Sequence, residues 1–160
     1  MNRIVFLQDL LDRRFGEGTT QVILPITDPY VKHHGALGSY ATVFLKPGTS
    51  PAAALALLAQ QPGVELVLGR EAAARTLDLP VDRIGDLVVV ADRGTTLGKS
   101  KATLDLSELD GIRLRSHGGL SDRKVYLMFS RPLSDEYAGI ALRRPLRNFD
   151  VFDFVLNGLR

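Results

Sequence analysis

The chain contains no cysteine among its 160 residues. Disulfides, iron–sulfur clusters and thiol catalysis are therefore excluded, and any metal ion must be held by histidine, carboxylate or hydroxyl ligands. No apolar run approaches the length that spans a bilayer, and the first residues lack the basic-then-apolar layout of a signal peptide. These absences predict a cytoplasmic protein.

An excess of one charge is also missing. The net charge is only +2, and the basic residues are dispersed along the chain, so a nucleic-acid partner is not expected. Hydrophobic residues make up 45% and charged residues 24%, which is ordinary for a soluble globular protein. The sequence has no internal repeats and no low-complexity segment. Its length predicts a single domain over residues 1–160, and the alternation of strands and helices predicts the α/β class.

The first half of the chain alternates between helical and extended patterns. Apolar residues at helical spacing predict a helix over Ile4–Phe15, with no strand before it and with Gly16 as its stop. A short apolar run predicts a strand at Gln21–Pro25. Residues 41–91 then predict a small β-α-β-α-β lobe, in which two helices cover one face of the strands. The expected elements of this lobe are the strands Ala41–Leu45, Val64–Leu68 and Asp86–Ala91 and the helices Ala52–Gln61 and Arg70–Leu77.

The second half is less regular. Asp92–Arg115 shows no periodicity and is expected to be a polar loop, and Val125–Phe129 is expected to be another strand. Residues 134–147 are expected to be a surface loop. It carries a cluster of Arg143, Arg144 and Arg147, for which attraction of an anionic substrate is the alternative. Asp150 and Asp153 resemble the acidic start of a last helix.

The candidate metal-site residues are histidines in two short segments of the chain. In Arg115–Gly119, His117 is flanked by a serine and two glycines, an arrangement in which a tight loop presents imidazole to a metal ion. The alternative is an ordinary surface turn. His33 and His34 also invite a metal interpretation, but adjacent residues point in different directions and seldom share one ion.

Gly98–Ser100 reads Gly-Lys-Ser, the end of a phosphate-binding loop motif. The motif requires another glycine five positions before the one that precedes lysine, and the nearest, Gly94, lies only four positions before it. A nucleotide site is therefore not expected.

Several segments resemble phosphonoacetate hydrolase, a member of the alkaline phosphatase superfamily. These segments follow the order of that family and span nearly the whole chain. They are Leu24–Val31, His33–Ser39, Gly85–Val90, Leu114–Ser121 and Leu146–Asp150. The resemblance implies an α/β fold that corresponds to the C-terminal portion of an alkaline-phosphatase-like enzyme. It also implies cleavage of the carbon–phosphorus bond of phosphonoacetate to acetate and phosphate, with two zinc ions and a threonine nucleophile.

Only one position of the family's site is found in this chain. His117 resembles the late histidine that completes one zinc site. The nucleophilic threonine, several aspartates, an earlier histidine and an Asp-His-Gly ligand pair have no counterpart, and Asp-His occurs nowhere in the sequence. One histidine cannot hold zinc tightly, because zinc sites use three or four protein ligands. We therefore expect no catalytic residue, no tightly bound zinc and no activity in this chain alone.

Three alternatives stay open for the function. The chain is part of a phosphonate hydrolase, or a non-catalytic domain that binds a ligand or partner, or one half of a site that a second polypeptide completes. Sheet edges that a larger enzyme would cover are expected to favour a homodimer.

Overall fold

The computed structural model describes residues 3–25, 37–104 and 118–160. The chain divides into two compact units, Met1–Arg123 and Lys124–Arg160, and each is described by itself. The single domain expected over 1–160 stays a prediction. In the described parts of the chain, no helix is long and apolar enough to cross a membrane.

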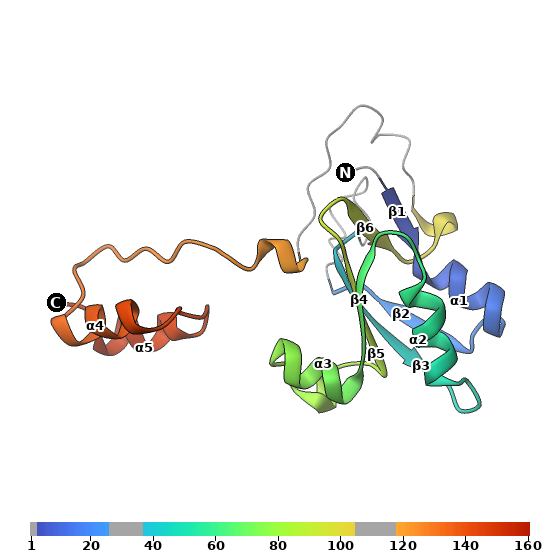
Figure 1. Cartoon of the computed structure of the whole chain (residues 1–160), viewed down its shortest axis with the longest axis horizontal. Coiled ribbons are helices and arrows are strands. Elements are labelled where there is room, and N and C mark those ends of the chain that lie inside the picture. The colour runs from blue at the N-terminus through green and yellow to red at the C-terminus, as the bar shows by residue number, and fades with distance from the viewer. Residues whose placement is uncertain (1–2, 26–36, 105–117) are drawn as a thin grey trace. The chain divides into compact units, whose positions relative to one another are not determined.

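The first unit contains a four-stranded sheet and a two-stranded sheet (Figure 1). The larger sheet is antiparallel and has the order β2-β3-β5-β4, whereas the smaller one pairs β1 with β6 in parallel. The strands are β1 (Arg3–Phe6), β2 (Thr20–Ile23), β3 (Tyr40–Leu45), β4 (Val64–Gly69), β5 (Leu87–Ala91) and β6 (Thr95–Gly98). The helices are α1 (Leu7–Phe15), α2 (Pro51–Ala59) and α3 (Arg70–Leu77), with short 3-10 turns η1 (Val81–Arg83), η2 (Lys101–Thr103) and η4 (Leu120–Asp122).

The predicted β-α-β-α-β lobe is confirmed as β3-α2-β4-α3-β5. Local signals in the sequence explain why. The side chain of Ser50 accepts a hydrogen bond from the N–H of Ala53 at 3.3 Å, and Pro51 occupies the first helical position of α2. All five residues of β5 are buried, as expected for a central strand covered on both faces.

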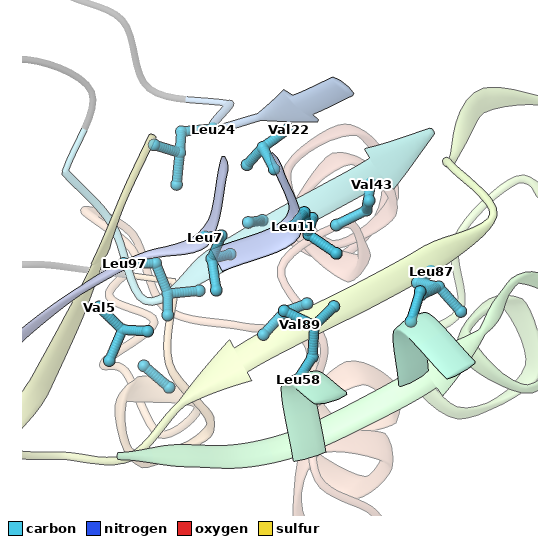
Figure 2. Packing of buried hydrophobic residues seen from close by; sticks show 13 residues of the cluster. Val5, Leu7, Leu11, Val22, Leu24, Val43, Leu58, Leu87, Val89 and Leu97 are labelled. Carbon is cyan, nitrogen blue, oxygen red and sulfur yellow. The ribbon is translucent and has the colours of Figure 1, made fainter. Parts of the chain in front are cut away.

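The two helices of the lobe cover opposite faces of the sheet, so the expectation that both cover one face is wrong. Ala54 and Leu58 of α2 pack with Leu87 and Val89 in the main core, to which α1 also contributes (Figure 2). The alternate residues of β5 face a second cluster around Ala73 of α3. Because successive side chains of a strand point to opposite faces, β5 supplies both cores at once.

The start of the chain differs from its prediction. Arg3–Phe6 forms strand β1, and the helix begins only at Leu7. The segment from Asp92 also differs, because Thr95–Gly98 forms β6 and is buried at all four positions. The two corrections have one cause: each strand is stabilised by the other, which lies about ninety residues away in sequence.

The second unit contains α4 (Asp135–Arg143) and α5 (Asp150–Asn157). The last helix is thus confirmed, with Asp150 and Asp153 in its first turn. The surface loop expected at 134–147 is wrong, because Ser134 caps α4 by accepting a hydrogen bond from the N–H of Tyr137. The strand expected at Val125–Phe129 is also wrong: the segment has no regular secondary structure, no described strand pairs with it, and Tyr126 is 94% exposed.

Candidate functional site

All three histidines, His33, His34 and His117, lie outside the described residues, as does Arg115–Ser116. The metal site predicted at His117 therefore stays a prediction. The structure does describe the residues that follow these histidines, which are Leu37–Tyr40 and Gly118–Gly119.

Gly118–Gly119 lies beside Ser39 and Tyr40. A Cβ atom at Gly118 would be 3.3 Å from Cβ of Tyr40, and one at Gly119 would be 3.3 Å from Cβ of Ser39. Gly118 has a φ of 91°, a left-handed backbone conformation that favours glycine. Gly118–Gly119 thus lies against the start of β3, with close contact at both positions and a backbone at Gly118 that a larger residue would strain.

Backbone hydrogen bonds fix this meeting point. Gly38 and Leu97 exchange two hydrogen bonds, of 3.2 Å and 2.7 Å, and the carbonyl of Ser39 accepts a hydrogen bond from the N–H of Ala91 at 2.8 Å. The start of β3 is therefore held between β5 and β6. A binding site next to Gly38–Ser39 would therefore have a rigid backbone on one side.

A groove of about 560 Å³ opens beside the same point. Tyr40 and Gly118 line it, together with a mostly apolar wall and the guanidinium-bearing Arg83. The remaining lining residues are Ile23, Pro25, Thr42, Phe44, Leu79, Pro80 and Ile84. Burial raises the pKa of the Tyr40 hydroxyl, so this group remains a protonated donor at neutral pH.

The groove suits binding better than catalysis. Its lining, as far as the described residues form it, offers hydrogen-bond donors and a positive charge but no carboxylate or imidazole for proton transfer. The hydroxyl of Thr42 is engaged as the acceptor for the N–H of Gly85 at 2.6 Å. Within residues 3–25, 37–104 and 118–160, no three histidine or acidic side chains lie close enough to hold a metal ion.

Gly98–Ser100 has a structural role in the fold. Gly98 ends β6, where a Cβ atom would come within 2.9 Å of the Phe6 ring. The carbonyl of Lys99 accepts a hydrogen bond from the N–H of Gln8, and the side chain of Ser100 caps η2 by accepting from the N–H of Ala102. Glycine at this position is explained by packing against β1.

The arginine cluster has partners inside the second unit. Arg144 forms a bidentate pair with Asp150, with distances of 2.7 Å and 2.9 Å, and the N–H of Arg147 donates to the same carboxylate. The guanidinium of Arg147 also lies 4.7 Å from the centre of the Phe149 ring. Arg143 belongs to the last turn of α4. These contacts join the end of α4 to the start of α5.

The Arg144–Asp150 pair predicts a pH-dependent second unit. The hydrogen bond from Arg144 and the one from the N–H of Arg147 lower the pKa of Asp150 to about 2. A depressed carboxyl pKa stabilises the folded state above its ordinary value near 4, and that contribution disappears as the pH falls towards 2. The amide NMR signals at the start of α5 should therefore shift between about pH 4 and pH 2, as Asp150 takes up a proton and its hydrogen bonds weaken.

Two variants test this interpretation. Asp150→Asn should weaken α5 at neutral pH and flatten its response below pH 4, because the ionisable partner of Arg144 is gone. Asp135→Asn should keep the acid response, since it leaves the Arg144–Asp150 pair intact. An unchanged acid response in Asp150→Asn would show that another group controls it.

Comparison with known proteins identifies relatives of the chain. No protein-family model matches the sequence. Two solved structures of phosphonoacetate hydrolase from Sinorhizobium meliloti 1021 do match, one in complex with phosphonoacetate and the other with phosphonoformate. Each shares 48% sequence identity with this chain, at a TM-score of 0.65 and over 74% of its residues. The chain spans 29% of the length of those structures, which is consistent with a C-terminal portion.

Proposed function

This chain is related to phosphonoacetate hydrolase over part of that enzyme's length, and on this premise we propose that it works as the C-terminal portion of a phosphonate hydrolase. The proposed reaction is hydrolysis of the carbon–phosphorus bond of phosphonoacetate to acetate and phosphate. The observation that carries the proposal is the 48% identity with structures that bind phosphonoacetate and phosphonoformate. Because the chain covers 29% of the length of those structures, we expect further polypeptide to contribute to the active site.

His117 is the residue of this chain that we assign to the site, as one ligand of a zinc ion. Zinc would supply positive charge for the phosphoryl oxygens and for activation of the nucleophile. The described residues do not provide a full ligand set, since no three suitable side chains lie together. Because the family's Asp-His-Gly pair and nucleophilic threonine have no counterpart in this sequence, we assign the other ligands and the nucleophile to further polypeptide, and no catalytic step is assigned to the residues of this chain.

Catalysis should consequently require a second polypeptide. Positioning of all the reacting groups supplies much of the rate, so an incomplete set loses nearly all activity rather than a share of it. The chain alone should release no phosphate from phosphonoacetate, even with excess zinc. Co-expression with the part of the S. meliloti enzyme that this chain does not match should produce turnover.

Phosphate release from the co-expressed pair tests the assignment of His117. His117→Ala should reduce turnover by about a thousandfold or more, as expected for loss of a ligand from a site that acts as a unit. Arg75→Ala, on the exposed surface of α3, is the matched control and should leave turnover unchanged. Absence of turnover in the pair would contradict the proposed function. Turnover by the chain alone that depends on His117 would contradict the need for a partner.

A non-catalytic binding domain is the second candidate function. The groove beside Tyr40 favours it, because apolar walls and the cationic Arg83 suit a small organic anion. Titration of the chain alone with phosphonoacetate, followed by amide NMR, separates the two functions. Shifts confined to the groove, combined with an inactive co-expressed pair, would favour the binding domain.

A further inference from the structure

Strand β1 has one edge that no described strand covers. It pairs in parallel with β6, and these two strands form a sheet of their own (Figure 1). The far side of β6 is occupied by Gly38, which bonds to Leu97. Parallel strands occur almost only in larger sheets with covered faces, and two strands alone are marginally stable. The outer edge of β1 is therefore the point at which this sheet can continue.

The hydrogen bonds of β6 show which groups of β1 point to that edge. Leu97 directs both its N–H and its C=O at Gly38, so its neighbours on β6 are the residues that bond to β1. The register places Val5 opposite Leu97, and in a parallel ladder Val5 is then the residue that bonds to those neighbours. Alternate residues of a strand bond to opposite sides. Ile4 and Phe6 therefore direct their N–H groups to the outer edge.

A groove of about 450 Å³ runs along this edge. All four residues of β1 line it, from Arg3 to Phe6. Successive side chains of a strand point to opposite faces, so a groove that touches all four follows the edge of the strand rather than one face. Its other side is formed by α1, by Gln61–Pro62 and by Lys101.

The charges around the groove favour an acidic occupant. Arg3, Arg13 and Lys101 line it, against the single carboxylate of Asp9. Burial opposes ionisation of Asp9, but hydrogen bonds from Lys101 N–H and the Ser100 side chain, with nearby positive charges, lower its pKa. Asp9 thus stays ionised and engaged. Among the ion pairs of the described residues, none includes Arg3, Arg13 or Lys101.

We propose that the outer edge of β1 receives an extended segment with acidic side chains, supplied by the part of a phosphonoacetate hydrolase that this chain does not match. The segment would pair with the N–H groups of Ile4 and Phe6 and place carboxylates beside Arg3, Arg13 and Lys101. It would convert β1–β6 into part of a larger sheet. This inference rests on the proposed function for the identity of the partner.

A second copy of this chain fits the groove less well. Two copies paired through β1 would bring two sets of three cations together, and like charges at an interface oppose association. The part of the relatives that this chain does not match is the larger share of their length, since the chain covers 29% of it, and we take this part as the partner. The homodimer expected from the sequence is therefore an alternative outcome of the experiment.

Hydrogen exchange tests the pairing directly. The full chain is co-expressed with the tagged, unmatched part of the S. meliloti enzyme, and the complex is purified without substrate. The amides of Ile4 and Phe6 should exchange rapidly in the free chain and slowly in the complex, whereas that of Val5 should be protected in both. A complex that leaves Ile4 and Phe6 exchanging as in the free chain would overturn the proposal, and so would the absence of a complex.

Charge reversal tests the acidic character of the segment. Arg13→Glu should weaken the complex by about tenfold or more, because like charges are then juxtaposed. Arg14→Glu is the matched control, since Arg14 is also exposed on α1 but does not line the groove, and it should bind as the unchanged chain does. Equal affinities for the two variants would contradict an acidic occupant. Protection of Ile4 and Phe6 in the chain alone, with a dimer in sedimentation, would identify a second copy instead.

The two proposals can fail separately. Binding is measured here without substrate, so a complex with protected β1 amides and no phosphate release supports the sheet extension and contradicts the proposed function. Phosphate release without protection of the Ile4 and Phe6 amides supports the proposed function and contradicts the sheet extension.

Discussion

Gly85→Ala should destabilise the first unit by about 3 kcal/mol, because a side chain there would meet the backbone of Val43 as well as the hydroxyl of Thr42. A Cβ atom at Gly85 would lie 2.5 Å from the carbonyl oxygen of Val43 and 2.9 Å from its carbonyl carbon. The N–H of Gly85 also donates to the hydroxyl of Thr42, and its carbonyl accepts from Arg70, so the segment cannot shift without losing both bonds. β3 and β5 would have to separate where β5 begins.

Denaturant unfolding followed at the amides of β5 measures this loss of stability. Gly94→Ala is the matched control. A Cβ atom there has its nearest neighbour at 3.7 Å, an ordinary contact, and the backbone is not in the left-handed region. The control should change the free energy of unfolding by about 0.5 kcal/mol or less. Similar effects for both variants would show that Gly85 is not enclosed by β3.

Local pattern was sufficient for the lobe between residues 41 and 91. Each of its elements carries its own signal, such as Ser50 and Pro51 at the start of α2 or the unbroken apolar run of β5. These signals act within a few residues, so a sequence reading can find them. The relation to phosphonoacetate hydrolase was also read correctly from the sequence, since the segments that carry it are continuous.

Strands β1 and β6 could not be found in the same way. Each has only four residues, and each owes its conformation to pairing with a distant segment. Two threonines and a glycine made β6 look like a polar loop, although Thr96 is fully buried. The glycine is there because the rings and branches of Phe6 and Ile4 occupy the space above it. Such long-range pairing leaves no trace in local periodicity.

Two predictions for the second unit were wrong for other reasons. Ser134, Asp135 and Glu136 form the start signal of a helix, and this signal was available in the sequence for α4. The apolar run at Val125–Phe129 matched a strand pattern, but a strand needs a neighbouring strand, and none of the described strands pairs with it. For the candidate site, the sequence predicted His117 as a metal ligand, and the comparison identified phosphonoacetate hydrolase as a relative. His117 itself lies outside the described residues, so its surroundings stay a prediction.

Leu97→Ala should be the other strongly destabilising change, with a loss of about 2–5 kcal/mol in the free energy of unfolding of the first unit. Leu97 is fully buried and packs in the main core with Val5 and Leu7 (Figure 2). Truncation removes apolar contacts and leaves a cavity where β6 meets that core, and the surrounding strands can close it only in part.

The same substitution at Leu156 is the control for Leu97→Ala. Leu156 is 80% exposed on α5, so its truncation should cost about 0.5 kcal/mol or less. Denaturant unfolding followed at the amides of β5 for Leu97→Ala, and at those of α5 for Leu156→Ala, measures each effect in its own unit. A loss below about 1 kcal/mol for Leu97→Ala would mean that β6 does not pack as described. Because β1 pairs with β6, that result would also remove the basis for extending the sheet beyond β1.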